Sequence, residues 1–401
     1  MRTEQRPARI DKGVNQGDDA VKVLIVTPSY SPVVGGSETL VRAICTKLNE
    51  LGIATDIMAF NMERKWNPIW TKRIEHNSIN RILKIPALNP FPFLRVNPLY
   101  YLLRLNVLPR LDFKKEFEEY DLIHFFGEAD LSLPFFSRSV RKPKILQCVS
   151  IPILAEQFRR HTTMKKLFVR IFPALADIFI AFSSEDRKAL LDLGVSQDKV
   201  LVWPYGIDTE VFRPDESKKL DNLILFVGRI ERIKGLHVFL EALRLLKFKT
   251  QAVLIGPASD SEYFKQISRM SLEVEREGVH SIEYLGSMEQ HDLLSWYQKA
   301  TVLVRPDLVG PSGTGIATME ALACGTPVIG VQNHVVRDRV NGRIIQPNNP
   351  AMLAESLEEV LKDRELARKY GREGRRIMEE EYNLKTALNK LVQVYESLLS
   401  N

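Results

Sequence analysis

The sequence of 401 residues has little of what marks several broad classes of protein. Its three cysteines, Cys45, Cys148 and Cys324, are far apart and give neither a disulfide framework nor the spacing of a metal site, which suits a reducing cytoplasm. No apolar run approaches the roughly 18 to 20 residues that a membrane-spanning helix needs. Residues 1–20 are polar and lack the apolar core of a secretory signal, so we expect a disordered tail there.

Several catalytic motifs are also missing. The sequence has no Walker A motif, no H-E-x-x-H, no serine nucleophile elbow and no D-x-D pair for a divalent metal. The composition, 45% hydrophobic and 26% charged, is that of a globular protein, and the length corresponds to two or three domains of about 150 residues. Together these features exclude a disordered chain, a disulfide-stabilised miniprotein and a collagen-like repeat.

Positive charge is concentrated in the first half of the chain. Residues 64–110 and 138–170 each contain nine basic residues and one acidic residue, together with aromatic residues and leucines. This composition is typical of a surface that contacts an anionic membrane or a polyanionic partner, although a solvated basic face has it too. We expect a peripheral membrane contact through these two segments, and no nucleic-acid partner.

Short β-branched runs alternate with helical patterns along both halves. The first run, residues 21–27, is continuously apolar, which is typical of a buried parallel strand. The alternation predicts right-handed crossovers and parallel sheets. The other strand candidates are 54–60, 80–85, 121–126, 144–149, 177–182, 199–203, 223–229, 251–256, 282–286, 301–306, 327–331 and 343–347.

The alternation restarts near residue 222, after the stretch from Pro204 to Pro214. We therefore expect an α/β protein of two doubly wound, Rossmann-like domains, whose ligand binds between them at the carboxyl ends of the strands. Residues 86–110 interrupt the pattern, because their five prolines forbid a long regular element, and we interpret them as an amphipathic insertion. The predicted division is a tail (1–20), an N-terminal domain (21–210), a C-terminal domain (211–383) and a last helix (384–401) that returns to the N-terminal domain.

Three loops that follow predicted strands carry residues suited to a phosphate. In PSYSPVVGGSE (28–38), Gly35 and Gly36 let backbone amides approach an anion at a helix N-terminus, although a tight turn needs the same glycines. In GRIERIKG (228–235), Arg229 and Lys234 can bind a diphosphate, or form a solvated basic turn.

The third loop opens the segment GPSGTGIATMEALACGTPVIG (310–330), where a helix N-terminus offers free amides. Glu320, later in that helix, can accept two hydroxyls of a ribose if its face meets the cleft, or can simply be solvated. The three loops together favour a nucleoside diphosphate in the cleft between the domains.

With these residues identified, the chain resembles the retaining glycosyltransferases of family 4, which have the GT-B fold, from about residue 21 to residue 400. Besides the three loops, segments 176–214, 285–307 and 341–363 are similar to the family's domain connection, to the stretch before its signature helix, and to its closing segment. So many matches in one order identify the chain as a member of this family.

The resemblance implies a role for each loop. Arg229 and Lys234 would bind the diphosphate and stabilise its charge as it leaves, and His124, in the segment DLIH, would lie near the transferred sugar. The donor would be a nucleotide-diphosphate sugar, with no cofactor and no metal. The other implied donor contacts are Gly35, Gly36, Gly315 and Ile316 for the diphosphate, Glu320 for the ribose, and Ser312, Gly313 and Thr314 for the sugar.

Four positions depart from the family pattern. Ser312 stands where the family has the first glutamate of its signature, and a serine keeps a donor and an acceptor but no charge. Tyr205, His334 and Phe126 replace a family asparagine, glutamate and histidine. These departures concern the donor sugar and the reacting face, whereas both cations of the diphosphate site are present.

The resemblance implies a retaining, metal-independent hexosyltransferase in which the acceptor attacks from the face that the diphosphate leaves. From the basic N-terminal half we expect a lipid-linked or membrane-proximal glycan as acceptor, at the cytoplasmic face of a membrane. A soluble sugar acceptor is the alternative. A non-catalytic nucleotide-binding partner of another transferase and a nucleotide-sugar epimerase are the other hypotheses.

Overall fold

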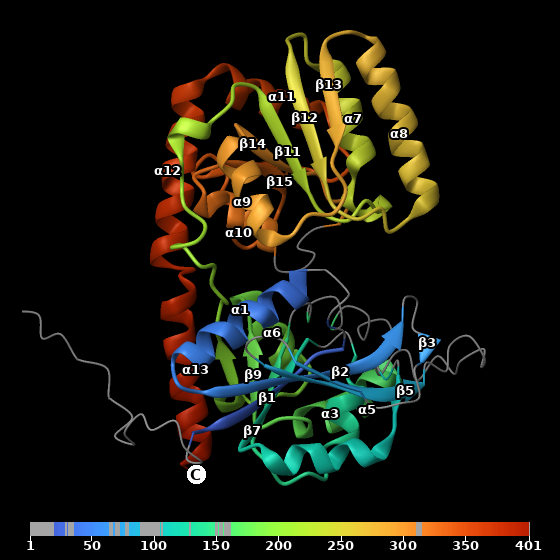
Figure 1. Cartoon of the computed structure of the whole chain (residues 1–401), viewed down its shortest axis with the longest axis vertical. Helices are drawn as coiled ribbons and strands as arrows, with labels where there is room; N and C mark the ends of the chain where they lie inside the picture. Colours follow the sequence, from blue (N-terminus) through green and yellow to red (C-terminus); the bar gives the residue numbers. More distant parts are fainter. Residues whose placement is uncertain are drawn as a thin grey trace, which may run out of the picture.

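The computed structural model shows two α/β halves stacked along the long axis of the molecule (Figure 1). None of the helices in the described part of the chain combines the length and apolarity needed to cross a bilayer. Of the predicted tail, only Ala20 is described. The described residues are 20–28, 30, 36–63, 67–68, 73–76, 80–88, 105, 107–127, 130–148, 151, 155, 162–309 and 315–400.

The N-terminal sheet is built on parallel strands. They are β1 (Lys22–Val26), β2 (Ala54–Glu63), β5 (Arg81–Leu88), β7 (Leu122–Phe126), β8 (Lys144–Gln147), β9 (Ile178–Ala181) and β10 (Val200–Val202). Their order in space, with the edge strand β4 (Arg73–His76), is β10-β9-β8-β7-β1-β2-β5-β4. The chain therefore builds one side of the sheet from β1 outward and the other side from β7 outward. The reversal lies between β1 and β7, which pair in parallel.

One edge of this sheet adds antiparallel strands that the sequence pattern did not predict. β4 is antiparallel to β5, and the two-residue strands β3 (Asn67–Pro68) and β6 (Leu108–Pro109) are antiparallel to β2 and β5. These edge strands are too short or too polar to give an apolar run in the sequence. Pro86 lies within β5, where its missing N–H costs one ladder bond while its carbonyl accepts from the amide of Arg110.

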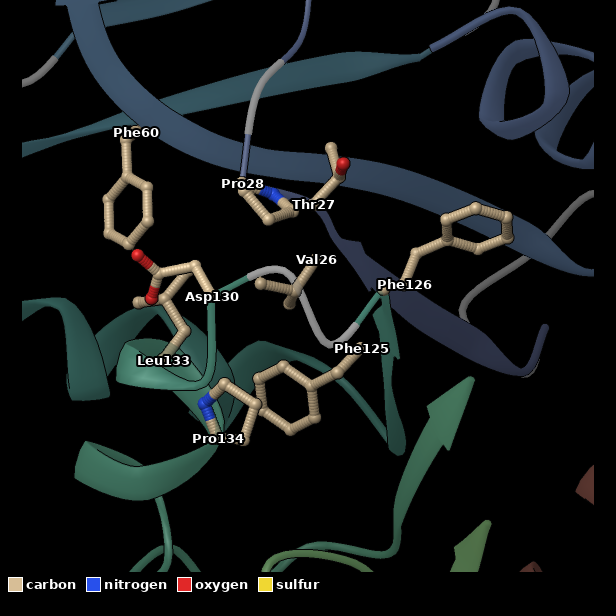
Figure 2. A pocket seen from close by; sticks show the side chains of 10 residues that line it. Val26, Thr27, Pro28, Phe60, Phe125, Phe126, Asp130, Leu133 and Pro134 are labelled. Atoms are coloured by element: carbon tan, nitrogen blue, oxygen red, sulfur yellow. The ribbon is translucent and has the colours of Figure 1, made fainter. Parts of the chain in front are cut away.

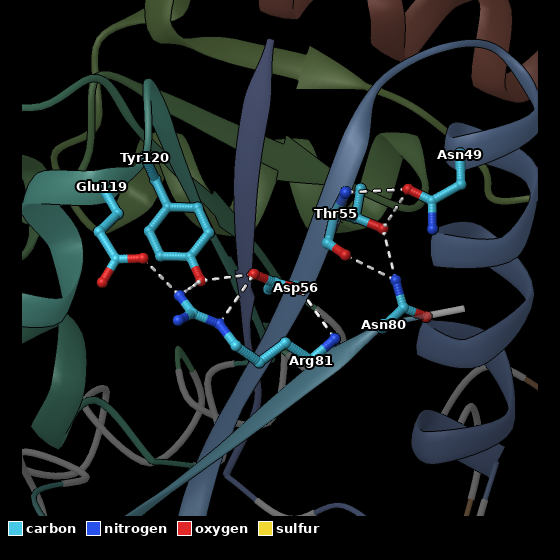
Figure 3. Close-up of polar contacts among 7 residues, drawn as sticks. All are labelled: Asn49, Thr55, Asp56, Asn80, Arg81, Glu119 and Tyr120. Carbon is cyan, nitrogen blue, oxygen red and sulfur yellow. Dashed lines mark hydrogen bonds and ion pairs between the residues drawn. The ribbon is translucent and has the colours of Figure 1, made fainter. Parts of the chain in front are cut away.

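A polar network joins the amino ends of β2 and β5 (Figure 3). The Arg81 guanidinium donates to Asp56, to Glu119 at 2.6 Å and to the Tyr120 hydroxyl at 2.8 Å. The Tyr120 hydroxyl in turn donates to Asp56 at 2.7 Å. The network lies at the end of the strands opposite to the predicted ligand edge. Arg81 there donates only to side chains of the protein itself. The network therefore stabilises the sheet.

Helices cover both faces of the N-terminal sheet. α1 (Gly36–Glu50) lies on one face and buries Leu40, Ile44 and Leu48, as its helical spacing predicts. The opposite face is covered by short helical segments. These are the 3-10 helix η1 (Leu111–Glu119), α3 (Ser132–Phe136), α5 (Thr162–Ile171), η2 (Phe172–Ala174) and α6 (Ser184–Asp192); η3 (Gln197–Lys199) follows α6 and buries no side chain.

The C-terminal sheet is entirely parallel. Its strands are β11 (Leu223–Val227), β12 (Thr250–Ile255), β13 (His280–Tyr284), β14 (Val302–Arg305), β15 (Val328–Val331) and β16 (Gly342–Ile345), in the order β13-β12-β11-β14-β15-β16. The reversal lies between β11 and β14. α7 (Leu236–Leu245), α8 (Ser261–Arg276) and α11 (Pro350–Lys362) cover one face, and α9 (Gln290–Lys299) and α10 (Ile316–Ala323) cover the other.

The chain passes between the halves at two adjacent places. Ile207 donates its amide hydrogen to the Tyr382 carbonyl at 2.7 Å, so that both crossings are joined. After α12 (Arg364–Glu380), the last helix, α13 (Leu384–Leu399), packs beside α1 (Figure 1). There the Trp203 indole donates to the Ala387 carbonyl at 2.6 Å. The domain limits given above stay predictions.

Candidate functional site

The cationic loop 228–235 lies at the carboxyl edge of the C-terminal sheet, beside the reversal between β11 and β14. The Leu308 amide donates to the Ile233 carbonyl at 2.9 Å, which ties this loop to the one that follows β14. Gly235 has φ 67°, and a Cβ there would lie 1.9 Å from the Pro306 oxygen. Only glycine therefore lets the two loops approach this closely.

Lys234, one of the two predicted diphosphate cations, belongs to a cluster of three charged side chains. Its Nζ lies 2.7 Å from Asp307 Oδ1, and Arg305 Nε lies 3.2 Å from Asp307 Oδ2. The side chains of Lys234, Asp307 and Arg305 are 15%, 10% and 12% exposed. Two cations thus share one carboxylate, and the cluster carries a surplus positive charge at the edge where a ligand is expected.

Burial and neighbouring charge shape this cluster. Burial lowers the pKa of Lys234, and the nearby Arg305 charge lowers it further, while Asp307 acts in the opposite sense. Burial raises the pKa of Asp307, but the Arg305 and Lys234 charges outweigh it and hold that pKa below its usual value. Asp307 therefore stays ionised at neutral pH. A phosphate that binds here would be a second anionic partner for Lys234.

Arg229, the second predicted cation, lies on the same loop in a different environment. Its side chain is 55% exposed, and its Nη1 lies 2.9 Å from Glu231 Oε1. Because the Arg229 side chain is largely in solvent, it can exchange this partner at little cost. Arg229 is therefore free to turn toward an anion bound at Lys234.

The glycine-rich loops are described only in part. Gly35, Ser312, Gly313 and Thr314 lie outside the described residues. Gly36 opens α1, and Gly315 is the residue before α10, whose first residue is Ile316. The roles predicted for these residues stay predictions.

A pocket lies between the two halves, and Ile316, the first residue of α10, is part of its wall. It has about 760 Å³ of empty space, part of it open to solvent. α1 lines it from the N-terminal half, the connection 205–212 closes one side, and Gln290, Ile316 and Met319 line it from the C-terminal half. The start of α10, the predicted diphosphate contact, therefore faces α1 across a space large enough for a ligand.

Glu320, the predicted ribose ligand, is turned into the protein in this structure. It is 3% exposed, and its two oxygens accept hydrogen bonds of 2.7 Å, one from Gln290 Nε2 and one from the Tyr297 hydroxyl. Burial raises the pKa of Glu320 to about 7, against the hydrogen bonds from Tyr297 and Gln290, which lower it. The structure places Glu320 one layer beneath the pocket wall.

His124, predicted to lie near the transferred sugar, is not brought to the other predicted residues. It is completely buried in β7, and its Nδ1 lies 2.8 Å from the Tyr395 hydroxyl of α13. Burial lowers its pKa to about 3, so its imidazole is neutral. A side chain without exposed surface contacts no substrate in this conformation.

The reversal point of the N-terminal sheet is mostly apolar (Figure 2). A small pocket there is lined by the ends of β1 and β7 and by the start of α3, with Phe60, Phe125 and Pro134 among its walls. Asp130 reaches it as well, and its Oδ1 accepts from the Ser132 amide at 2.7 Å. The described residues at the reversal point of the N-terminal sheet are thus mainly apolar, whereas those at the reversal point of the C-terminal sheet are charged.

Sequence reasoning missed four of the residues that shape the site. Arg305 lies near the end of the predicted strand 301–306 and Asp307 directly follows it, which is the available signal, but the pairing of Asp307 with Lys234 joins positions 73 residues apart. Gln290 and Tyr297 lie in segment 285–307, which carries the family resemblance but assigns them no role, and they meet Glu320 only through the packing of α9 on α10.

Two family models match the chain in succession. The model for Glycosyltransferase Family 4 matches residues 34–211, and the model for group 1 glycosyl transferases matches residues 208–377. O-antigen chain mannosyltransferase C of Escherichia coli is 24% identical over 397 residues, which cover 95% of this chain and all of that protein. D-inositol 3-phosphate glycosyltransferase of Frankia alni is 30% identical over 204 residues, about half of each chain.

Solved structures resemble the whole molecule. HepE of Anabaena, solved in complex with UDP and glucose, superposes with a TM-score of 0.72 over 94% of this chain and all of that one, at 18% identity. Sucrose-phosphate synthase of Thermosynechococcus elongatus gives a TM-score of 0.71 over 95% of this chain and 99% of that one, at 19% identity. These likenesses confirm the predicted GT-B fold of two Rossmann-like domains.

Proposed function

This chain belongs to glycosyltransferase family 4 and transfers a sugar from a nucleotide-sugar donor, and we propose that it does so with retention of configuration and without a metal, moving a hexose to a lipid-linked or membrane-proximal glycan. The observation that carries the proposal is the cluster of Lys234, Arg305 and Asp307 at the reversal of the C-terminal sheet. Its surplus positive charge lies where parallel α/β sheets bind phosphates.

The proposed chemistry is stabilisation of the leaving diphosphate. As the bond from the sugar to the diphosphate breaks, negative charge grows on the departing oxygen, and Lys234 is already fixed by Asp307 and by the closely packed loops. Arg229 joins it by leaving its exposed contact with Glu231. These cations supply the positive charge that a divalent metal supplies in other transferases, which supports metal independence.

The family resemblance implies retention, and Ser312 bears on the route by which it is reached. The position of the family's first signature glutamate holds Ser312, which has no charge to attack the sugar carbon. We therefore propose that the acceptor hydroxyl attacks from the face that the diphosphate leaves, and that the diphosphate takes its proton. Incubation of donor and acceptor with a chelator, followed by NMR of the product, tests both points. An inverted anomeric centre, or loss of turnover in the chelator, would contradict the proposal.

The lipid-linked acceptor is supported by the N-terminal half. The described residues between 131 and 176 include no acidic side chain, while Arg138, Lys166 and Arg170 are exposed, as is Leu167 of α5 at 40%. The relative that matches nearly the whole chain is named for the transfer of mannose in an O-antigen chain, which supports a glycan as the acceptor. We propose that this face docks on an anionic membrane, at its cytoplasmic side.

Co-sedimentation with lipid vesicles tests the docking. The wild type should pellet at least fivefold better with anionic than with neutral vesicles at low salt, and Lys166→Glu with Arg170→Glu should remove the preference. Lys247→Glu with Lys249→Glu, which makes the same change in charge at two exposed positions of the C-terminal half, is the matched control. Equal pelleting with both kinds of vesicle would favour a soluble acceptor instead.

Ser312 also favours a second candidate, a non-catalytic partner of another transferase. That protein would bind a nucleoside diphosphate without turning over any donor, and would copurify with a second transferase. Turnover by the purified chain alone excludes it.

A further inference from the structure

Another pocket lies at the edge of the C-terminal sheet opposite to the cationic loop 228–235. It has about 760 Å³ of empty space, part of it open to solvent. Its walls include residues just before β11, β14 and β15, and α12 closes it from outside. Because the strands of this sheet are parallel, their amino ends share one edge. The pocket therefore lies across the sheet from Lys234 and the proposed donor site.

Lys219 is a partly buried cation on the wall of this pocket. Its Nζ donates to the Ala300 carbonyl at 2.9 Å and to the Thr326 hydroxyl at 2.7 Å. Both acceptors are neutral, and Lys219 forms no ion pair with any carboxylate of the described residues. An ammonium group has three N–H donors, so one of them is left for a further acceptor.

The surroundings of Lys219 make an anionic ligand favourable. Burial lowers its pKa to about 8, although the nearby Glu216 and Cys324 favour the charged form. Taking an ammonium group out of water costs free energy, and a well-placed opposite charge offsets that cost. An anion in the pocket would supply this charge and accept the third N–H.

Two arginines of α12 bring more positive charge to the same pocket. Arg364 and Arg368 are four residues apart, which puts them on one face of the helix. Arg364 pairs with Asp221 and Arg368 pairs with Glu365, and all four side chains are more than half exposed. Such exposed pairs contribute little and can open for another anion. Among the described lining residues, three cations thus face two carboxylates, Glu216 and Asp221.

We propose that this pocket binds a phosphate group, either as inorganic phosphate or as a small phosphate monoester, with Lys219 as the buried anchor and Arg364 and Arg368 as outer contacts. A guanidinium fork matches two phosphate oxygens, and an ammonium group acts as a point charge. Lys219 also holds Thr326, which follows the end of α10. A phosphate bound here would therefore stabilise the C-terminal half without competing with the donor.

Calorimetric titration with inorganic phosphate and with glycerol 3-phosphate tests the proposal. Lys219→Met should weaken the binding of the tighter probe at least tenfold, and Arg368→Gln at least threefold. Lys218→Met removes the neighbouring exposed lysine, which pairs with Asp215, and should keep the affinity of the wild type. Tighter binding of glycerol 3-phosphate would identify a phosphate monoester as the ligand, and tighter binding of inorganic phosphate would identify the free ion.

A variant of the donor cation separates the two sites. Lys234→Ala should bind both probes as tightly as the wild type, because Lys234 lies at the other edge of the sheet. Loss of binding in Lys234→Ala would show that the probes occupy the donor site and would overturn the inference. Equal weakening by Lys218→Met and Lys219→Met, or no binding of either probe to the wild type, would overturn it too. If Lys219→Met does not fold, Arg368→Gln decides, since its side chain is exposed.

Discussion

The reversal points of the two sheets lie in equivalent places and differ in their chemistry. Between β11 and β14 the C-terminal sheet ends in Lys234, Arg305 and Asp307, three charges with a positive surplus. Between β1 and β7 the N-terminal sheet ends mainly in apolar side chains such as Phe60 and Phe125. Among the described residues, the same topology thus offers one strongly charged edge and one mainly apolar edge, and on this ground we propose that the donor diphosphate binds chiefly to the C-terminal half.

The largest expected effect comes from removing the charge of Lys234 at the C-terminal reversal point. Lys234→Ala should lower kcat at least a hundredfold, equivalent to about 2.7 kcal/mol of transition-state stabilisation, because the departing diphosphate loses its buried cation. Steady-state rates of nucleoside diphosphate release measure this. Lys218→Ala, an exposed lysine of the same half paired with Asp215, is the control. Near-normal kcat in Lys234→Ala would refute the assignment of the cation.

A glycine at each reversal point sharpens the comparison. Gly235→Ala should weaken nucleoside diphosphate binding at least tenfold, because its Cβ would force the Pro306 loop away. Gly127, which ends β7, has φ 93° and open space around its Cβ position, so Gly127→Ala should cost only about 1–2 kcal/mol of unfolding free energy. Calorimetric titration and urea unfolding measure both variants. Equal losses of affinity in the two would contradict the assignment of the donor to one edge.

Asp307 sets how strongly the charged edge attracts an anion. Asp307→Asn should raise the affinity for nucleoside diphosphate about threefold at low salt, because Lys234 no longer shares its charge with a carboxylate. The ligand-free protein should lose about 1–3 kcal/mol of unfolding free energy, since two largely buried cations are left poorly paired. Titrations at two salt concentrations and urea unfolding test this. Weaker binding at low salt would show that Asp307 mainly positions Lys234.

The smallest expected effect concerns pH. Burial raises the pKa of Glu320 to about 7 in the folded protein, whereas the ordinary value of 4.5 applies in the unfolded chain. Between pH 4.5 and pH 7, folding is therefore coupled to the uptake of a proton by Glu320. The stability contributed by Glu320 is therefore present below pH 4.5 and is lost as the pH rises through 7. Glu320→Gln should remove this loss, so that the Tm of the wild type falls relative to the variant across that window. Parallel Tm profiles would contradict the buried, raised carboxyl.

The sequence predicts the C-terminal sheet far better than the N-terminal edge. Parallel strands buried on both faces, such as β11 and β12, are continuous apolar runs, and the predicted runs overlap them. β4, with the sequence RIEH, has no such pattern, because an exposed edge strand is held by backbone bonds to its neighbour.

The site is predictable where local chemistry decides and not where distant packing decides. A loop after a strand with Arg229 and Lys234 indicates a phosphate from sequence alone. The burial of His124 depends on Tyr395, 271 residues away, and that of Glu320 depends on α9. Neither contact leaves a local pattern in the sequence. The residue types of His124 and Glu320 therefore suggested contacts with the substrate, although the fold buries both side chains.

The most direct test of the donor site is the thermal stability of the protein in the presence of nucleoside diphosphates, with a chelator added. We predict that one of UDP, GDP, ADP, CDP and TDP, at about 100 times its dissociation constant, stabilises the wild type by about 2.7 kcal/mol, and that Lys234→Ala loses most of this gain. An equal gain in the variant, or no gain with any base in the wild type, would contradict the account.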